Sequence, residues 1–418
     1  MQKEFAAFIG IDWADRKHDV CLAVAGSNKL ERLVLEHRPA AIRAWAEKLR
    51  ERFGGAPIAV CLELSQGPIV SALLEHDFFV LFPVQPVTLA RYRSAFATSR
   101  AKDDPTDAEF ALELLLRHPD KLTRLAPESV GMRSLRRLVE ARRTLVEDRV
   151  RLTNRITAAL KAYFPQVLDC FRDKEAAVFA DFIERWPTLE LVQRARAQTL
   201  ADFFRAHNVR SESAIQHRID ALRSEHPLTT DQAVIAPMRL LVETLLPQLR
   251  AATAAIVRFD SEIARLGPQL PDYEFFRALP GAGPALAPRL LVAFGERRER
   301  FPDAAALQKY AGVAPVTERS GNKSWVHWRV ACPTFLRQTF IEWVAQTVPR
   351  SFWAKAFYQA CRARGMRHQA ALRALAFKWI RVLHRCWVER TPYDESRYLL
   401  ALQKRHAPLL KFAASPSP

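Results

Sequence analysis

The first 84 residues alternate strand-like and helix-like patterns in an order that few folds share. Three apolar runs bounded by turn residues come first, followed by a helical pattern, a strand, a second helical pattern and a last strand. The expected strands cover residues 5–12, 18–26, 29–37, 56–64 and 78–84, and the expected helices cover residues 39–53 and 67–76. This order predicts a mixed α/β domain built on one sheet.

Two acidic residues stand at strand ends within these apolar runs. Asp12 ends the first run, and Glu63 lies near the end of the fourth. A three-strand meander followed by two helix–strand units is the order of a ribonuclease H-like sheet, in which the first and fourth strands are neighbours. A buried acid in an apolar strand is costly unless it is paired or binds a cation. We therefore expect the two carboxylates to lie side by side.

Three more aspartates occur within five positions of the segment SRAKDDPTDAEFALELLL, residues 99–116. One interpretation is helix capping, with Asp104 as the N-cap, Pro105 first in the helix and Asp107 third. The other is a metal site, because Asp104 and Asp107 share a helix face with their Cβ atoms roughly 5–6 Å apart. A helix start holds both acids rigidly, so one arrangement serves both purposes.

Four acids that converge on one point repel each other unless divalent cations neutralise them. Two Mg²⁺ ions about 4 Å apart, or Mn²⁺ in their place, would do so and would clamp the attacking and leaving oxygens of a phosphodiester. The predicted catalytic metal ligands are Asp12, Glu63, Asp104 and Asp107. Alternatives stay open: Asp15 and Asp103 each stand beside a chosen acid, Glu63 could pair with an arginine, and the acids could merely cap and pair.

The chain is strongly basic, with 63 Lys and Arg against 45 Asp and Glu, a net charge of +18 and a pI near 10.0. This excess of positive charge favours a nucleic acid over a membrane surface as the partner. The affinity for that nucleic acid should fall as the salt concentration rises. The six cysteines include no CxxC pair, which indicates free thiols in a reducing cytosol rather than a zinc site. No secretory pattern and no apolar segment of membrane length are recognised, so a cytoplasmic, nucleoid-associated protein is expected.

Beyond about residue 126 the strand-like patterns give way to helices. Apolar residues at three- and four-residue spacing predict a long helix, which forms either a coiled coil between subunits or a helix packed on the next one. These residues are Leu135, Leu138, Leu145, Leu152 and Ile156. Further on, Gly281 and Gly283 form a turn before an apolar helix. The turn is either a DNA-phosphate site of the helix–hairpin–helix kind or an ordinary corner between helices.

Five motifs occur in the order seen in the DEDD insertion-sequence transposases, the bridge-RNA-guided recombinases, and the chain resembles that family. The motifs are FIGIDWADRKHDVCLAV, CLELSQGP, AKDDPTDAEFA, LPGAGPALAPRLL and YAGVAPVTERSG. The resemblance covers roughly residues 1–120 and 270–350. Its specific part is the combination of Lys-x-Asp-x-x-Asp-Ala with Gly-x-x-Pro…Ser-Gly.

The resemblance implies a domain organisation and a second catalytic group. The expected parts are an α/β RNase H-like (RuvC-like) domain at 1–125, a helical coiled-coil region at 126–270, a mainly α transposase domain at 271–390 and a tail at 391–418. The four acids would bind Mg²⁺, and Ser320 in ERSGNK would be the nucleophile. The family also implies a homo-oligomer, a dimer or tetramer, with composite sites. A structured noncoding bridge RNA would pair with donor and target DNA.

The serine chemistry is coherent from first principles. A serine hydroxyl is a weak nucleophile at neutral pH, so Ser320 needs a base or a metal ion. Attack on a phosphodiester would conserve the bond energy in a phosphoserine link, so that DNA ends could be rejoined without ATP. Arg319, Lys323 and Arg329 flank the serine, either as groups that stabilise the transition-state charge or as ordinary DNA-facing surface.

The segment after the serine departs from the family pattern. Many relatives continue past Ser-Gly into a Lys-Arg-Gly-Asn stretch, whereas this chain has NKSWVHWRVACPTFLRQTF. Ser320 therefore remains the preferred serine, with Ser324 as a weaker rival. Trp325 and Trp328 are candidates either for stacking on exposed bases or for core packing. Asp103 stands where relatives often have a small polar residue.

These observations support an RNA-guided, Mg²⁺-dependent DNA recombinase as the leading hypothesis. One alternative is a metal-dependent, structure-specific nuclease resembling junction resolvases, which would use water as the nucleophile. The other is a non-catalytic nucleic-acid-binding relative. A covalent protein–DNA link separates the first from the second, and loss of function on removing Asp12 separates both from the third.

Overall fold

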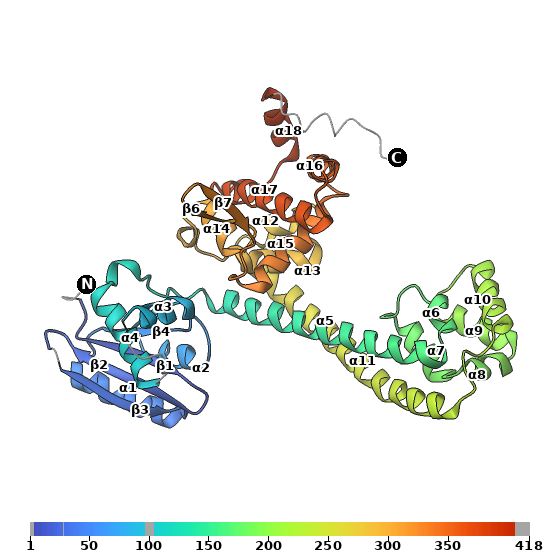
Figure 1. The fold of residues 1–418 in the computed structure, drawn as a ribbon, viewed down its shortest axis with the longest axis horizontal. Coiled ribbons are helices and arrows are strands. Elements are labelled where there is room, and N and C mark those ends of the chain that lie inside the picture. The colour runs from blue at the N-terminus through green and yellow to red at the C-terminus, as the bar shows by residue number, and fades with distance from the viewer. Residues whose placement is uncertain (1–3, 28, 97–103, 406–418) are drawn as a thin grey trace. The chain divides into compact units, whose positions relative to one another are not determined.

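The computed structural model describes residues 4–27, 29–96 and 104–405. The chain divides into two compact units, residues 1–127 and 128–418. Unit 1 carries a mixed α/β sheet, and unit 2 is mostly helical (Figure 1). The finer boundaries expected at residues 270 and 390 stay predictions.

Unit 1 is built on a five-stranded sheet with the strand order β3-β2-β1-β4-β5. The strands are β1 (Ala7–Trp13), β2 (Lys17–Val24), β3 (Leu30–Glu36), β4 (Ile58–Leu62) and β5 (Phe79–Pro83). The first three strands are antiparallel, and β4 and β5 run parallel to β1. The predicted pairing of the first and fourth strands is confirmed. The predicted end of the first strand was one residue short, because β1 continues past Asp12 to Trp13.

The helices of unit 1 cover both faces of this sheet. They are α1 (Pro39–Phe53), α2 (Pro68–Leu73), α3 (Pro86–Phe96), α4 (Asp104–Arg117) and the 3₁₀ turn η1 (Pro119–Lys121). On one face, Ile9, Ile11 and Val60 share a core with residues of α1 and α2. On the other, Phe8 and Cys61 share a core with Ala108 and Leu112 of α4 and with α3. Strand alternation thus sends odd residues of β1 to one core and even residues to the other.

Unit 2 begins with two long helices and the short helices between them. These are α5 (Val130–Tyr163), α6 (Gln166–Cys170), α7 (Ala177–Arg185), α8 (Leu189–Arg194), α9 (Ala197–Ala206), α10 (Glu212–Ser224) and α11 (Gln232–Leu266). The helix α5 packs along α11 of the same chain. Arg142 ties the pair by donating from Nη2 to Asp260 at 3.0 Å. The predicted long helix is confirmed and packs on a neighbour in its own chain. A coiled coil between subunits stays a prediction.

The long helices connect two separate hydrophobic cores. Met132 and Leu135 of α5 belong to the core of the C-terminal helices, whereas Ile156 and Leu160 belong to the core with α6–α10. One apolar stripe on each long helix therefore serves both cores.

The expectation that no segment reaches the apolarity and length of a membrane span was wrong for α11. By length and composition alone, the helix over residues 232–269 could cross a membrane. In this structure the apolar residues of α11 pack inside the protein: Val242, Leu245 and Leu249 are buried in the core shared with α5 and α7.

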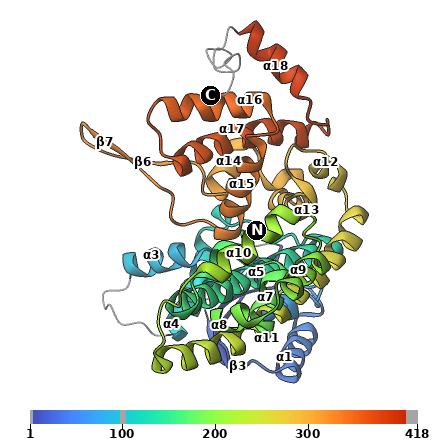
Figure 2. The same ribbon diagram turned by 90° about the vertical axis from the view of Figure 1, so that its right-hand side faces the viewer.

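The last part of unit 2 is a helical bundle with one β-hairpin. Its elements are η2 (Gly267–Gln269), α12 (Tyr273–Arg277), α13 (Gly283–Phe294), η3 (Arg298–Arg300), α14 (Ala304–Tyr310), β6 (Val316–Ser320), β7 (Lys323–His327), α15 (Thr334–Thr347), α16 (Phe352–Ala363), α17 (His368–Val388) and α18 (Glu395–Lys404). Trp343, Trp353 and Trp379 are fully buried and form its aromatic centre. The β6–β7 hairpin extends away from these helices (Figure 2).

Candidate active site

Asp12 and Glu63 lie at the same edge and on the same face of the unit 1 sheet. Ile11 pairs with Leu62 in the β1–β4 ladder, so the two acids follow paired residues. Asp12 is flanked in sequence by Ile11 and Trp13, and Glu63 is flanked by Leu62 and Leu64. All four flanking residues pack in the core with α1 and α2. Since successive strand residues point to opposite faces, both acids are directed to the face that α4 covers.

The first turn of α4 is fixed over this face by a close approach to β1. A Cβ added to Gly10 would lie 2.0 Å from the carbonyl oxygen of Ala108 and 2.5 Å from the amide nitrogen of Leu112. Only glycine lets the helix backbone lie this near the strand. Asp107 precedes Ala108, and Gly10 lies two residues before Asp12. The contact therefore sets Asp107 near the edge of the sheet where Asp12 and Glu63 stand.

Of the remaining aspartates of the acidic segment, the structure describes only the backbone of Asp104. The helix α4 begins at Asp104, one turn before Asp107, so these two residues share a helix face as expected. The side chain of Asp104 and the whole of Asp103 lie outside the described residues. The predicted helix start at Pro105 was one residue late, because α4 begins at Asp104. The capping hydrogen bond predicted for the Asp104 side chain stays a prediction.

Asp107 is paired with an arginine that the sequence did not single out. The Nη1 atom of Arg93 donates to both carboxylate oxygens of Asp107, at 2.7 and 2.6 Å. The Asp107 side chain is 7% exposed and that of Arg93 is 26% exposed. A carboxylate this buried requires a counter-charge, and Arg93 on α3 supplies it. The alternative that an acid of this set pairs with an arginine thus holds for Asp107.

The chemistry of the donor set fits Mg²⁺, although the described side chains do not by themselves form a closed site. Asp12, Glu63 and Asp107 offer the hard carboxylate oxygens that Mg²⁺ takes, on one face of one sheet edge. Among the described residues, however, no three Asp, Glu, His or Cys side chains are close enough together to hold a metal ion. Metal binding at this edge would have to draw on Asp104 and on an Asp107 released from Arg93.

The edge next to Asp12 also holds a pair of histidines, of which His18 is buried and His37 is half-buried. His18 pairs with Trp13 across β1 and β2, is fully buried, and its Nε2 lies 2.9 Å from Nδ1 of His37. Burial and then the charge of His37 lower the pKa of His18 to about 4. The pKa of the Cys61 thiol is raised to about 12 by burial and then by the charge of Glu63. The influence of Glu63 on Cys61, which lies in the core with α4, is consistent with the Glu63 side chain facing α4.

The lowered His18 pKa predicts acid sensitivity of unit 1. As pH falls below 6.5, the unfolded chain protonates His18 while the folded chain does not until about pH 4. The free energy of unfolding should therefore drop between pH 6.5 and 4, by up to about 3 kcal/mol. Urea unfolding across this range should show the drop in the wild type and a flatter profile in His18→Gln. Equal slopes in the two proteins would rule out His18 as the cause.

Ser320 lies in unit 2 at the end of the β6–β7 hairpin. It pairs with Lys323 across a two-residue turn, in which Gly321 has a φ of +55°. Such turns need a left-handed residue at this position. Both Ser320 and Lys323 are exposed. The serine thus lies at the exposed tip of the hairpin, directly opposite a lysine.

The face of the hairpin that carries Ser320 also carries a polar network. Glu318 accepts hydrogen bonds from Nε1 of Trp325 and lies 3.1 Å from Nε2 of His327. The hydrogen bond with His327 lowers the pKa of Glu318. By register, Ser320, Lys323 and these three residues share one face. The network braces the two strands just behind the serine.

The other predicted nucleic-acid contacts are not all on this face. Arg319 pairs with Ser324, so both side chains point to the face opposite Ser320. Arg329 follows the hairpin, and its carbonyl oxygen accepts from Nη1 of Arg337. Trp325 and Trp328 are 41% and 50% exposed, so core packing is excluded for both.

The glycine turn before α13 has a packing role at one of its two positions. A Cβ on Gly281, whose φ is +71°, would lie 2.7 Å from the carbonyl oxygen of Gln346 on α15. Gly283 has a φ of +55° with open space around it and begins α13. Gly281 is thus explained by close packing between helices, and Gly283 keeps the exposed helix start that a phosphate would need.

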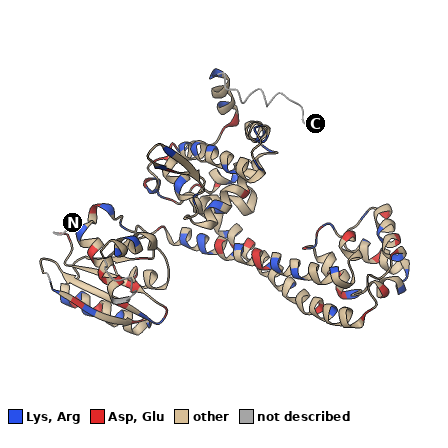
Figure 3. Ribbon diagram, viewed as in Figure 1, with Lys and Arg blue, Asp and Glu red and all other residues tan. Residues whose placement is uncertain are grey.

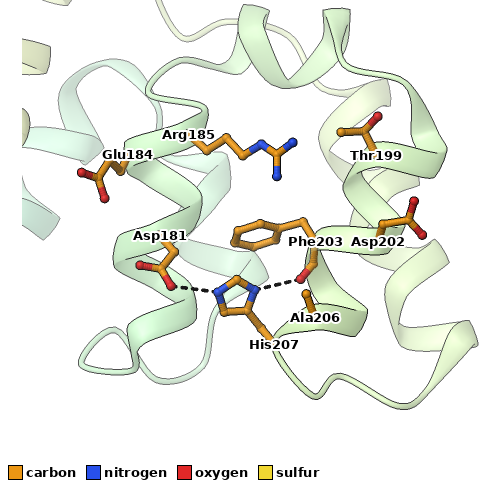
Figure 4. Close-up of a pocket in the computed structure, with 8 residues that line it drawn as sticks. All are labelled: Asp181, Glu184, Arg185, Thr199, Asp202, Phe203, Ala206 and His207. Carbon is orange, nitrogen blue, oxygen red and sulfur yellow. Dashed lines mark hydrogen bonds and ion pairs between the residues drawn. The ribbon is translucent and has the colours of Figure 1, made fainter.

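A pocket in the α6–α10 region was not foreseen. It is a shallow, open pocket of about 600 Å³. It is lined by Asp181, Glu184, Arg185, Thr199, Asp202, Phe203, Ala206 and His207 (Figure 4). The His207 ring bridges Asp181 and the carbonyl oxygen of Phe203, each at 2.8 Å. Arg250 contacts Asp181 from α11. These bonds tie α7, α9 and α11 together, which is a structural role.

The mixed α/β sheet domain, followed by a mostly helical unit, is consistent with the class of DEDD transposases. A family model described as "Transposase" matches residues 9–165, and one described as "Transposase IS116/IS110/IS902 family" matches residues 273–359. The chain belongs to the IS110/IS116 family of transposases. It is thus a DNA transposase, an enzyme that recombines DNA.

Three relatives agree with this assignment, two of them along nearly the full length of the chain. The chain is 30% identical to the "Mini-circle putative transposase for IS117" of Streptomyces coelicolor, over 99% of this chain and all of that protein. It is 32% identical to "Putative transposase y4uE" of Sinorhizobium fredii, over 49% of this chain and 57% of that protein. It is also 26% identical to the "Insertion element IS110 uncharacterized 43.6 kDa protein" of Streptomyces coelicolor, over 94% of this chain and 96% of that protein.

Proposed function

We propose that this transposase is an RNA-guided recombinase that cuts and rejoins DNA through Ser320, with Mg²⁺ held by acids of an RNase H-like, RuvC-like unit 1. The observation that carries the proposal is the shared placement of Asp12 and Glu63 on the face covered by the first turn of α4. Carboxylates gathered at one sheet edge are the ligands that Mg²⁺ takes in enzymes that act on phosphodiesters.

Each group has a distinct part in the proposed reaction. Asp12, Glu63, Asp104 and Asp107 would hold Mg²⁺, which would supply Lewis-acid stabilisation of the scissile phosphate. Ser320 Oγ loses its proton and attacks the phosphorus, a Ser–O–P bond forms, and the bond to one deoxyribose oxygen breaks. The displaced oxygen takes up a proton. Attack by another strand end on the phosphoserine reverses these steps and releases Ser320.

The hairpin suits this role for Ser320. The residue is exposed at the tip, so a DNA strand can reach it without the hairpin unfolding. Lys323 stands directly across from it and would bind the phosphate next to the attacked one as a mobile point charge. The exposed ring of Trp325 can stack on bases beside the hairpin, whereas the Arg373 guanidinium covers one face of the Trp328 ring, 2.6 Å from its centroid.

The charge of the chain supports large polyanionic partners. Lys and Arg are spread over both units, including along α5, rather than gathered in one spot (Figure 3). We therefore include in the proposal a structured guide RNA as well as donor and target DNA, bound by a homo-oligomer whose composite sites join acids of one subunit with the serine of another. Binding of each nucleic acid should weaken as salt rises.

A trapping assay tests this function. The full chain is incubated with donor DNA, target DNA, the noncoding RNA encoded beside its gene and Mg²⁺, and then resolved on a denaturing gel. The expected result is a protein–DNA adduct that requires both the RNA and the metal. Cut DNA ends without attached protein would instead support a nuclease that uses water. An adduct that forms equally without RNA would contradict RNA guidance.

A further inference from the structure

The Arg93–Asp107 pair creates a conflict within the proposed metal site. A single guanidinium nitrogen donates to both oxygens of Asp107, at 2.7 and 2.6 Å. A metal ion that binds Asp107 needs at least one of these oxygens and brings two positive charges toward the guanidinium. Like charges this close repel strongly, because the site is largely buried. Arg93 and a metal ion therefore compete for Asp107.

The fold determines which partner must move. Asp107 is held in place because Gly10 lets the backbone of α4 lie directly on β1, at Ala108 and Leu112. The helix cannot carry Asp107 away from the sheet without breaking this contact. Arg93, by contrast, is a long side chain in the last turn of α3 and is 26% exposed. Its guanidinium has a route to solvent that the Asp107 carboxylate lacks.

The base of the arginine is anchored while its end is free to move. Leu89 of α3 is buried in the core with α4, and the Tyr92 ring meets the Phe110 ring edge-on at 6.0 Å. The main chain at Arg93 is therefore fixed beside Asp107. Rotation about the side-chain bonds alone can exchange the guanidinium between Asp107 and solvent, and such rotamer changes are fast.

We propose that Arg93 is a positioning residue that neutralises Asp107, competes with the metal ion for its carboxylate, and is displaced when the ion binds. The inference rests on the proposed function, because it takes Asp107 as a metal ligand. Arg93 then neutralises a buried carboxylate when the metal is absent, which keeps α4 seated on the sheet. Metal affinity is correspondingly lower than the acids alone would give.

Metal binding to the full-length protein without nucleic acid tests this role. Mn²⁺ is titrated into the wild type and into Arg93→Ala, and bound metal is followed by electron paramagnetic resonance. We expect Arg93→Ala to bind Mn²⁺ about tenfold more tightly, because no guanidinium has to be displaced. Arg93→Lys, which keeps the charge, should stay near the wild type. Arg91→Ala is the matched control, because Arg91 is an exposed arginine on the same helix.

Thermal melting gives a second readout that does not require activity. Without metal, Arg93→Ala should melt below the wild type, since Asp107 loses its counter-charge. Added Mn²⁺ should raise the melting temperature of Arg93→Ala by more than that of the wild type, because tighter binding to the folded state stabilises it more. Equal metal-induced shifts in the two proteins would overturn the proposal.

Two further variants separate failure of this inference from failure of the proposed metal site. If Asp12→Asn and Asp107→Asn both weaken Mn²⁺ binding while Arg93→Ala leaves it unchanged or weaker, the metal site stands and the role of Arg93 is wrong. If neither Asp12→Asn nor Asp107→Asn changes Mn²⁺ affinity, the metal site and the role of Arg93 both fail.

Discussion

Replacing Ser320 by alanine is expected to abolish the covalent protein–DNA adduct and to lower strand cleavage by more than about 1000-fold. The variant removes the oxygen that forms the bond to phosphorus in the proposed reaction. The hairpin should keep its fold, because Ser320 is exposed and its place in the β6–β7 ladder depends on backbone bonds. Adduct yield on a denaturing gel measures the effect.

Ser324→Ala is the matched control for this experiment. Ser324 lies on the same hairpin but pairs with Arg319, so its side chain points to the other face. It should form the adduct at close to the wild-type level. Adduct that persists in Ser320→Ala and disappears in Ser324→Ala would transfer the nucleophilic role to Ser324.

The second large effect is expected at Gly10. In Gly10→Ala the new methyl group would lie 2.0 Å from the Ala108 carbonyl oxygen and 2.5 Å from the Leu112 nitrogen. Both are backbone atoms that no side-chain rotation can move aside, so α4 has to lift from β1. We expect a loss of at least about 3 kcal/mol in the stability of unit 1. Adduct formation should fall as well, because Asp107 moves away from Asp12.

Hydrogen exchange followed by mass spectrometry measures this change locally. In Gly10→Ala, amides of α4 and β1 should exchange faster, while those of unit 2 keep their protection. Gly55→Ala is the control, since Gly55 has a φ of +75° but open space around it. That variant should lose only about 1–2 kcal/mol from backbone strain. Equal effects of the two substitutions would refute the close-contact argument.

The sheet of unit 1 could be predicted from the sequence because its signals are local. Each strand is a short apolar run bounded by turn residues, and only a few strand orders accommodate a meander followed by two helix–strand units. The adjacency of β1 and β4 followed from that order. Alternation then placed Asp12 and Glu63 together, since their neighbours Ile11 and Leu62 are apolar and buried on the opposite face.

The features that could not be predicted depend on contacts between distant segments. Nothing in the segment LARYRSAF marks Arg93 as the partner of Asp107, because the pairing exists only once α3 packs on α4. The hairpin that presents Ser320 was missed because its strands lack the apolar alternation of a half-buried strand. The membrane-like composition of α11 went unrecognised, and its apolar residues serve the cores it shares with α5.

The most direct test of the proposed mechanism is the chemical identity of the protein–DNA link. The adduct formed with guide RNA, donor DNA, target DNA and Mg²⁺ is digested with nuclease and protease, and the modified peptide is sequenced by mass spectrometry. We predict a phosphate-linked nucleotide on Ser320, obtained with wild-type protein and absent from Asp12→Asn. A nucleotide attached to any other residue, or efficient strand exchange with no modified peptide, would contradict the account.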